Sequence, residues 1–378
     1  MKIVIVPQSF KGTATASVVA DAMMKSTKQI IPHADIIAIP MADGGTGTVN
    51  TLVNATNGML FETATVDPIG RPITAIWGVL GDKKTAVIET AAASGLSLLN
   101  SSDYNPEITT TRGTGILIRT AIDAGYSDIL LGIGDSATND GGVGLARALG
   151  IKPLDKFGKE LPEGGAALSE LESFNIDESI ISLSNINITV LCDVINPLCG
   201  PNGASAIYGP QKGASEKQID SLDKALSKLA RVVQIQFDKD ILDVPGAGAG
   251  GGLGAGLIGF FNAQLLPGFG VISRAVKLEE LLTRADIVLT GEGRIDSQTS
   301  LGKGVAGIAQ LSKLCGVKAV AAIVGSNELS DTDAAAIGID NVFALRKSQN
   351  VAIPSTEETL SLIESATKLA IETLMKGI

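Results

Sequence analysis

Residues 128–150, DILLGIGDSATNDGGVGLARALG, constrain the fold more than any other stretch of this chain. An apolar run of strand length breaks into glycines and short polar residues, and a helical pattern then begins. Glycines tolerate positive φ angles and the close approach of a ligand, and the N–H groups at a helix start attract phosphate or carboxylate. The stretch therefore predicts a strand, an anion-binding turn and a helix in succession.

Similar junctions follow apolar runs that begin at Val4, Ile39, Val190 and Val288. Each run ends in a loop built from Gly, Asp, Asn, Ser or Lys. In open α/β sheets, loops at the strand ends form the ligand site. The pattern predicts an α/β protein whose site is assembled from several strand ends.

The alternation of strands and helices predicts a sheet built from both ends of the chain. Strands are expected at residues 3–6, 35–39, 286–289, 319–324 and 341–344, and helices at 13–31, 304–314 and 356–375. Five apolar strands with helices between them indicate one doubly wound parallel sheet. We assign residues 1–60 and 285–378 to this discontinuous domain and residues 61–284 to an inserted domain. Two sequential domains divided near residue 200 are the alternative.

The inserted segment has a mixed α/β pattern. Short apolar runs at 63–66, 73–80 and 85–89 are separated by the turn sequences DPIGRP and GDKK, which favour an antiparallel meander. Helices near 111–124 and 216–235 and a strand at 188–191 follow, with a polar segment at 152–185. No residue from 244 to 273 is charged, but its glycines and prolines favour a buried loop and a packed helix over a membrane span.

Composition excludes several classes of protein. A formal net charge of −10 and a pI near 4.8 argue against a nucleic-acid or anionic-membrane partner. Three cysteines and one histidine argue against a disulfide scaffold and a zinc site. The apolar run before Pro7 is too short for the core of a signal peptide, so we expect a cytoplasmic protein in a reducing compartment.

The usual nucleotide-binding motifs are absent or weak. No Walker A sequence occurs, and the motif GxGxxG occurs at residues 246–251 and GxGxxA at 132–137. The acidic partner expected after the second motif would be Asp155, which lies in a polar segment and not at a strand end. A dinucleotide-dependent oxidoreductase of a small hydroxy acid and a non-enzymatic anion-binding regulator therefore stay as alternatives.

Acidic residues follow most of the predicted strands. They are Asp43, Asp135, Asp140, Asp193, Glu292 and Asp296, and lysines in similar loops are Lys11, Lys212 and Lys303. Phosphoryl transfer needs carboxylates to hold Mg²⁺ and to orient or deprotonate the acceptor hydroxyl, and cations to bind phosphate. A helix cap or an Asx turn explains any single aspartate as well as catalysis does. Six together favour a phosphoryl-transfer site.

Eight short blocks occur in order along almost the whole chain. They are SFKG (9–12), ADGGTGT (42–48), IETAAASGL (88–96), GIGDSATNDGG (132–142), CDVINPLCG (192–200), GPQKGA (209–214), GAGAGGGLG (246–254) and TGEGRIDSQTSLGKG (290–304). In these blocks the chain closely resembles the bacterial glycerate kinases of the type I family. The resemblance implies ATP-dependent phosphorylation of D-glycerate, use of Mg²⁺, and a flavodoxin-like domain from both chain ends that encloses an inserted α/β domain.

We expect glycerate and ATP to meet in a cleft between the two domains. Asp193 is expected to accept the hydroxyl proton or to hold Mg²⁺, with Asp43 as a further catalytic group and Asp296 as a metal ligand. Lys11 is expected to bind the substrate carboxylate or a phosphate. The residues expected to bind substrate or nucleotide are Ser9, Phe10, Gly44, Gly45, Asp135, Ser136, Asn139, Asp140, Asn196, Lys212, Gly291, Glu292, Gly293 and Lys303.

Two positions depart from the family pattern. Gln8 stands where the family commonly has an aspartate before SFKG, and Thr46 replaces the usual glutamate of ADGGEGT. Two carboxylates are thus missing near the expected cleft, and related sugar-acid or hydroxy-acid substrates stay open. The choice of hydroxyl depends on how the substrate is oriented, and 2-phosphoglycerate is the favoured product. The sequence leaves the oligomeric state open, a homo-oligomer included.

Overall fold

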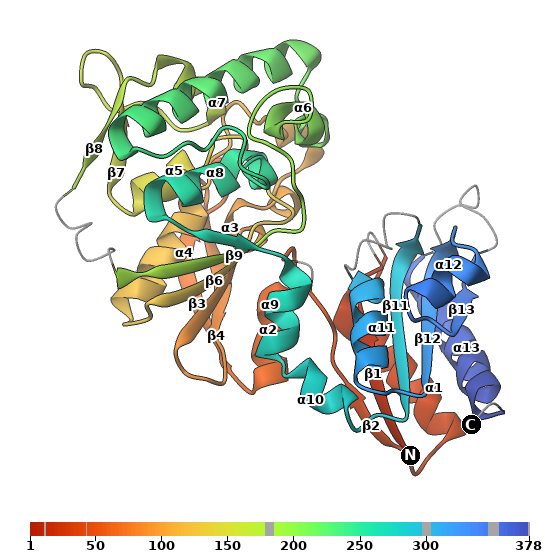
Figure 1. The fold of residues 1–378 in the computed structure, drawn as a ribbon. Coiled ribbons are helices and arrows are strands. Elements are labelled where there is room, and N and C mark those ends of the chain that lie inside the picture. Colours follow the sequence, from red (N-terminus) through yellow and green to blue (C-terminus); the bar gives the residue numbers. More distant parts are fainter. Residues whose placement is uncertain (11–12, 43, 178–184, 297–303, 347–354, 377–378) are drawn as a thin grey trace. The chain divides into compact units, whose positions relative to one another are not determined.

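The computed structural model describes residues 1–10, 13–42, 44–177, 185–296, 304–346 and 355–376. The chain divides into two units, one formed by Met1–Asp43 with Phe269–Ile378 and the other by Gly44–Gly268. Each unit has its own sheet, covered by helices (Figure 1). The chain passes from one unit to the other at residues 43/44 and 268/269, whereas the domain boundaries predicted from the sequence lie at 60/61 and 284/285.

The unit that contains both chain ends has a five-stranded parallel sheet in the order β13-β12-β11-β1-β2. Counted along the chain within this unit the order is 2-1-3-4-5, which is the flavodoxin-like arrangement. The strands are β1 (Lys2–Pro7), β2 (Asp35–Ala38), β11 (Ile287–Ile295), β12 (Ala319–Asn327) and β13 (Asn341–Ala344). The doubly wound parallel sheet predicted from the sequence is confirmed.

Helices cover both faces of this sheet because its strands are apolar on both faces. Helices α1 (Ala16–Ile30) and α13 (Thr356–Met375) pack together, and their apolar residues share one core with Ile3, Ile5 and Leu289. The alternate strand residues Val4 and Val288 are equally buried, and α11 (Gly304–Leu314) packs on β11 and β12. The unit also contains α10 (Leu278–Leu282) and α12 (Asp331–Ala336) (Figure 1).

The second unit has a six-stranded mixed sheet in the order β10-β9-β6-β5-β4-β3. Strands β3 (Met59–Val66), β4 (Pro72–Val79) and β5 (Thr85–Glu89) form the predicted antiparallel meander. Strands β6 (Asp128–Gly132), β9 (Asn187–Leu191) and β10 (Gln264–Leu266) continue from β5 as parallel neighbours. The carboxyl ends of β5, β6 and β9 therefore lie side by side.

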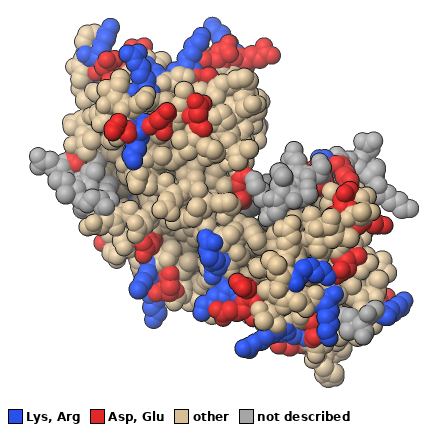
Figure 2. Space-filling model, in the orientation of Figure 1, with Lys and Arg blue, Asp and Glu red and all other residues tan. Residues whose placement is uncertain are grey.

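Short and long helices surround this second sheet. They are α2 (Thr48–Thr56), α3 (Ala91–Ser94), α4 (Arg112–Asp123), α5 (Val143–Ala148), α6 (Ala204–Tyr208), α7 (Glu216–Phe237) and α8 (Ala249–Phe261), whereas α9 (Gly268–Ala275) begins at the boundary and lies almost wholly in the first unit. The predicted polar segment at 152–185 contains most of a separate two-stranded sheet, β7 (Ile151–Leu154) with β8 (Ser173–Ile176). Acidic and basic side chains are interspersed on the surface shown in Figure 2.

The glycine-rich part of the uncharged segment, residues 246–259, is largely buried, as the sequence predicted. Helix α8 contains a left-handed turn at Gly250, Gly251 and Gly252, with φ angles of 64°, 71° and 86°. A Cβ atom on Gly251 would lie 1.9 Å from the carbonyl oxygen of Thr138, so glycine is required for this close packing. None of the described helices is long and apolar enough to cross a membrane.

Candidate active site

Three acidic residues lie at or just after the carboxyl ends of adjacent parallel strands in the second unit. Glu89 is the last residue of β5, Asp135 is three residues beyond β6, and Asp193 is two residues beyond β9. Because β5, β6 and β9 are parallel neighbours, these ends meet at one edge of the sheet. Ligand sites of open α/β sheets are built at this edge.

Asp135 is held in an unusual backbone conformation. Its φ angle is +57°, a left-handed value that few residues other than glycine adopt, although aspartate tolerates it. Its Oδ2 atom accepts hydrogen bonds from both the backbone N–H and the hydroxyl of Thr46, each at 2.9 Å. Thr46, one of the two departures from the family pattern, thus binds the exposed carboxylate of Asp135.

Four glycines bring the ADGGTGT and GIGDSATNDGG loops into backbone contact. The N–H of Gly134 donates to the carbonyl oxygen of Gly44 at 3.0 Å. A Cβ atom on Gly132 would lie 2.4 Å from that oxygen, and one on Gly134 would lie 2.8 Å from Cα of Gly45. The structure therefore gives Gly44 and Gly45, both predicted to bind a ligand, a packing role in joining the two loops.

Glu89 is a candidate functional residue that the sequence analysis missed. Its side chain is 8% exposed and accepts hydrogen bonds from the N–H groups of Gly47 at 3.2 Å and Val49 at 3.1 Å. Burial raises the pKa of Glu89, these backbone bonds oppose the rise, and the carboxylate of Asp135 adds to it. The start of α2 thus binds a carboxylate of the protein itself. The position of Glu89 at the end of the strand in IETAAASGL could have identified it.

Lys212 is completely buried inside this unit. It ends a short 3₁₀ helix, Pro210–Lys212, and its side chain is 2% exposed. Its Nζ atom donates to Oγ of Ser136 at 3.0 Å and to the carbonyl oxygen of Thr138 at 2.6 Å. Burial lowers the pKa of Lys212 to about 7, although the charge of Asp140 opposes the shift. Lys212 therefore binds the predicted site loop from within the protein.

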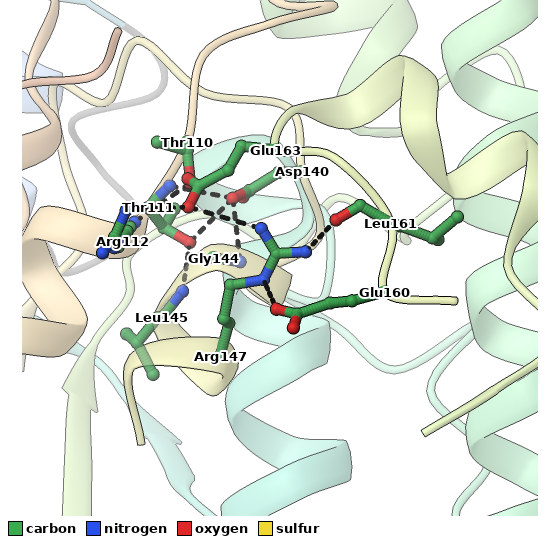
Figure 3. A network of polar contacts seen from close by, with 10 residues as sticks. All are labelled: Thr110, Thr111, Arg112, Asp140, Gly144, Leu145, Arg147, Glu160, Leu161 and Glu163. Carbon is green, nitrogen blue, oxygen red and sulfur yellow. Dashed lines mark hydrogen bonds and ion pairs between the residues drawn. The ribbon is translucent and has the colours of Figure 1, made fainter. Parts of the chain in front are cut away.

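Asp140 joins the starts of two helices (Figure 3). Its Oδ2 atom accepts from the N–H of Thr111 at 2.8 Å, from the hydroxyl of Thr111 at 2.9 Å and from the N–H of Gly144 at 3.1 Å. Its Oδ1 atom accepts from the N–H of Gly142 at 3.1 Å. Burial raises the pKa of Asp140, and these bonds oppose the rise. The contacts indicate a helix-capping role for this residue.

An ion-pair network lies beside Asp140 in Figure 3. Arg147, on α5, pairs with Glu160 at 3.1 Å and with Glu163 at 3.4 Å. Its guanidinium also donates to the carbonyl oxygen of Leu161. The network ties α5 to the segment after β7, so it supports the packing of the unit.

Two predicted asparagines are bonded within the protein. Asn139 is fully buried and donates from Nδ2 to Oγ of Ser205 at 3.0 Å, while its Oδ1 atom has no hydrogen-bond partner among the described residues. Asn196 accepts from the hydroxyl of Tyr208 at 2.7 Å and donates to the carbonyl oxygen of Asn202 at 2.9 Å. Asn196 therefore shapes the loop that follows β9.

Asp193 is half-buried, two residues beyond β9. One of its carboxylate oxygens accepts from the N–H of Gly268 at 3.1 Å, which ties the end of β9 to the end of β10. The next two residues, Val194 and Ile195, are exposed apolar side chains. The carboxylate thus lies at the edge of the sheet where Glu89 and Asp135 also lie.

Other predicted residues belong to the first unit. Ser9 is half-buried after β1, and Phe10 is 3% exposed and packs in the hydrophobic core. The N–H of Gln8 donates to the carbonyl oxygen of Gly291 at 2.7 Å. The Gln8 side chain lies against the start of α11, where a Cβ atom on Gly304 would lie 2.5 Å from its Oε1 atom. The core position of Phe10 indicates a structural role.

The GEG sequence of this unit, which was predicted to form a turn, is part of the sheet. Gly291, Glu292 and Gly293 lie within β11, and a Cβ atom on Gly291 would lie 2.1 Å from a carbonyl oxygen of β12. Asp296 pairs with Arg294 at 3.2 Å on the surface. Lys11, Asp43 and Lys303 lie outside the described residues.

The described residues do not support two other kinds of site, namely a cluster of three or more metal-binding side chains and a dinucleotide site. They contain no group of three or more His, Cys, Asp or Glu side chains that could hold a metal ion. Asp155, the acidic residue that a dinucleotide site would need, lies in a turn after β7, where its Oδ1 atom accepts from the N–H groups of Phe157 and Lys159. It is therefore a turn residue outside the six-stranded sheet.

Comparison with known proteins identifies close relatives over most of the chain. The model of the glycerate kinase family matches residues 3–375. A glycerate kinase of Bacillus subtilis (strain 168) is 46% identical over 345 residues, which cover 91% of this chain and 90% of the relative. A glycerate 2-kinase of Escherichia coli (strain K12) is 46% identical over 348 residues, with coverage of 91% and 90%.

A solved structure agrees with the fold. A crystal structure from Salmonella typhimurium LT2, named as a glycerate kinase 2, superposes with a TM-score of 0.86 at 40% sequence identity. The match covers 100% of this chain and 99% of that one. The similarity thus extends over both units.

Proposed function

Because the chain belongs to the glycerate kinase family and is a phosphotransferase, we propose that it transfers the γ-phosphoryl group of ATP to a hydroxyl of D-glycerate. The observation that carries this proposal is the match to the family over residues 3–375. We also propose a cytoplasmic location, because three cysteines in 378 residues are too few for a disulfide scaffold.

The product that we propose is 2-phosphoglycerate. The support is the relative from Escherichia coli, which is named a glycerate 2-kinase and is 46% identical over 91% of this chain. In the reaction, the 2-hydroxyl oxygen of glycerate forms a bond to the γ-phosphorus while the bond from that phosphorus to ADP breaks. The hydroxyl proton passes to a base, and ADP leaves.

Asp193 is our candidate for that base. It is half-buried at the end of β9, at the sheet edge where α/β proteins bind ligands. Both carboxylate oxygens of Asp140 are bonded within the protein, and the Oδ2 atom of Asp135 binds Thr46. These contacts give Asp140 a structural role, and the place of Asp193 at the sheet edge, two residues beyond β9, supports it as our candidate.

Mg²⁺ is the metal that we propose for the reaction, and it would neutralise the charge that develops on the phosphates during transfer. One or two carboxylates and the phosphates are enough to hold Mg²⁺. Asp296 is our candidate protein ligand for the ion, and holding Mg²⁺ is the alternative to the role of base for Asp193. We propose phosphate or substrate contacts for Lys11 and Lys303 and a catalytic role for Asp43.

Phosphorus NMR tests the activity directly. Incubation of the protein with Mg-ATP and D-glycerate should produce ADP and a phosphoglycerate, and the chemical shift and proton coupling distinguish the 2-phosphate from the 3-phosphate. A reaction without glycerate is the control for ATP hydrolysis. No turnover, or turnover that requires a nicotinamide cofactor, would reject the proposal.

Replacing Asp193 tests its assigned role. Asp193→Asn keeps the shape of the side chain but removes the base, so we expect kcat to fall by roughly two orders of magnitude or more. The melting temperature should stay nearly unchanged. Asp220→Asn, an exposed substitution on α7, is the matched control and should turn over normally. Near-normal turnover of Asp193→Asn would remove Asp193 from the mechanism.

A further inference from the structure

The position of Lys212 excludes a simple role as a surface cation. Its side chain is buried and its Nζ atom already donates to Ser136 and Thr138. The next residue, Gly213, has a φ angle of +92°, and a Cβ atom on it would lie 2.5 Å from the carbonyl oxygen of Tyr104. This tight backbone contact fixes the place from which the side chain of Lys212 extends.

The direction of the bond to Ser136 has a chemical consequence. A serine hydroxyl has one donor hydrogen and two acceptor lone pairs, and its hydrogen rotates to suit its neighbours. Because Nζ of Lys212 donates to Oγ of Ser136, one lone pair of this hydroxyl is used. The hydroxyl hydrogen of Ser136 is therefore directed away from Lys212 and is available to an acceptor other than this lysine.

The same loop contains a second polar atom with unused bonding capacity. Asn139 is fully buried, and its Oδ1 atom has no hydrogen-bond partner among the described residues. An unsatisfied buried atom of this kind needs an explanation, such as a catalytic role or a bound water or ion. Ser136 and Asn139 lie between Asp135 at the sheet edge and Asp140 at the helix starts. The loop thus combines a fixed backbone with polar groups that the chain does not fully satisfy.

We propose that Lys212 is a positioning residue for substrate binding. Through its bonds to Ser136 and Thr138 it holds residues 135–139 so that the hydroxyl of Ser136 donates to an anionic oxygen of the substrate. That oxygen belongs to the carboxylate of glycerate or to a phosphate of ATP. The inference rests on the proposed kinase activity, and it replaces the expectation that Lys212 itself contacts phosphate.

The contact would be strong because its surroundings are largely dry. Ser136 and Lys212 are both buried, so water competes little for the hydroxyl hydrogen. Hydrogen bonds to charged groups contribute more than neutral ones, and their loss typically weakens binding by about tenfold or more. Removal of either partner should therefore be visible in a Michaelis constant.

Steady-state kinetics of four variants test this inference. They are Lys212→Met, Ser136→Ala, the double variant, and Lys217→Met as a control at an exposed lysine on α7. We expect Lys212→Met and Ser136→Ala to raise the KM of the same substrate by about tenfold or more. The double variant should raise it no further than the larger single effect, because both act through one contact. The substrate whose KM changes identifies the anion.

The outcomes separate this inference from the proposed function. A purely structural role for Lys212 would lower the melting temperature or the active fraction while both KM values stay within twofold of wild type, and that result would overturn the inference. If Lys212→Met does not fold, Ser136→Ala decides alone, since unchanged KM values in this variant contradict the proposed donor. A wild-type protein that does not phosphorylate glycerate would reject both proposals.

Discussion

The buried amine of Lys212 predicts an unusual dependence of stability on pH. Burial lowers its pKa from 10.5 to about 7 in the folded protein. Unfolding returns the side chain to water, where the pKa is again near 10.5. Between these values the unfolded chain binds more protons than the folded one, so the free energy of unfolding should rise with pH. Deprotonation removes the cost of burying a charge.

The size of the effect follows from the two pKa values. Each pH unit well inside this window contributes about 1.4 kcal/mol. Because the folded amine is half protonated near pH 7, the gain from pH 7 to pH 9 is about 2 kcal/mol. Measurement should stop at pH 9, because burial raises the pKa of Cys199 to about 11 and this thiol lowers stability at higher pH.

Chemical denaturation monitored by tryptophan fluorescence is a suitable assay. Trp77 is the only tryptophan of the chain, lies on β4 in the same unit as Lys212, and stacks on Phe61 with ring centroids 4.8 Å apart. Its signal therefore reports on unfolding of that unit. The wild type and Lys212→Met are compared at pH 7, 8 and 9, so that other titrating groups cancel. Equal pH dependence in both proteins would refute the reasoning.

Three other substitutions test the packing of the site loops. Asp140→Ala leaves four buried donors without their acceptor and should cost about 3 to 5 kcal/mol, measured by urea denaturation. Gly251→Ala adds a Cβ atom 1.9 Å from a carbonyl oxygen and should cost at least about 2 kcal/mol more than Gly200→Ala, where φ is also positive but no atom lies within 4 Å. Equal costs would contradict this packing. Thr46→Val removes only the hydroxyl bond to exposed Asp135 and should cost about 1 kcal/mol or less by the same assay.

Local patterns in the sequence were sufficient for most of the fold. Apolar runs of strand length predicted β1, β11 and β12, and turn sequences predicted the meander of β3 to β5. Such patterns succeed because a strand buried on both faces must be apolar along its length. The β7–β8 hairpin was missed because its strands are short and lie in a polar segment, where periodicity is weak.

The candidate site, like the fold, was predicted from the sequence only in part. The sequence by itself located the loops at the strand ends, because glycines and short polar residues after an apolar run specify a turn locally. Only the tertiary structure decided what the side chains in those loops contact. Lys212 reaches Ser136 across 76 positions of the chain, and Glu89 reaches Val49 across 40. These contacts bury a lysine and place one of the chain's own carboxylates at a helix start. They depend on which strands are neighbours in the sheet, and the spacing of residues along the sequence does not encode that order.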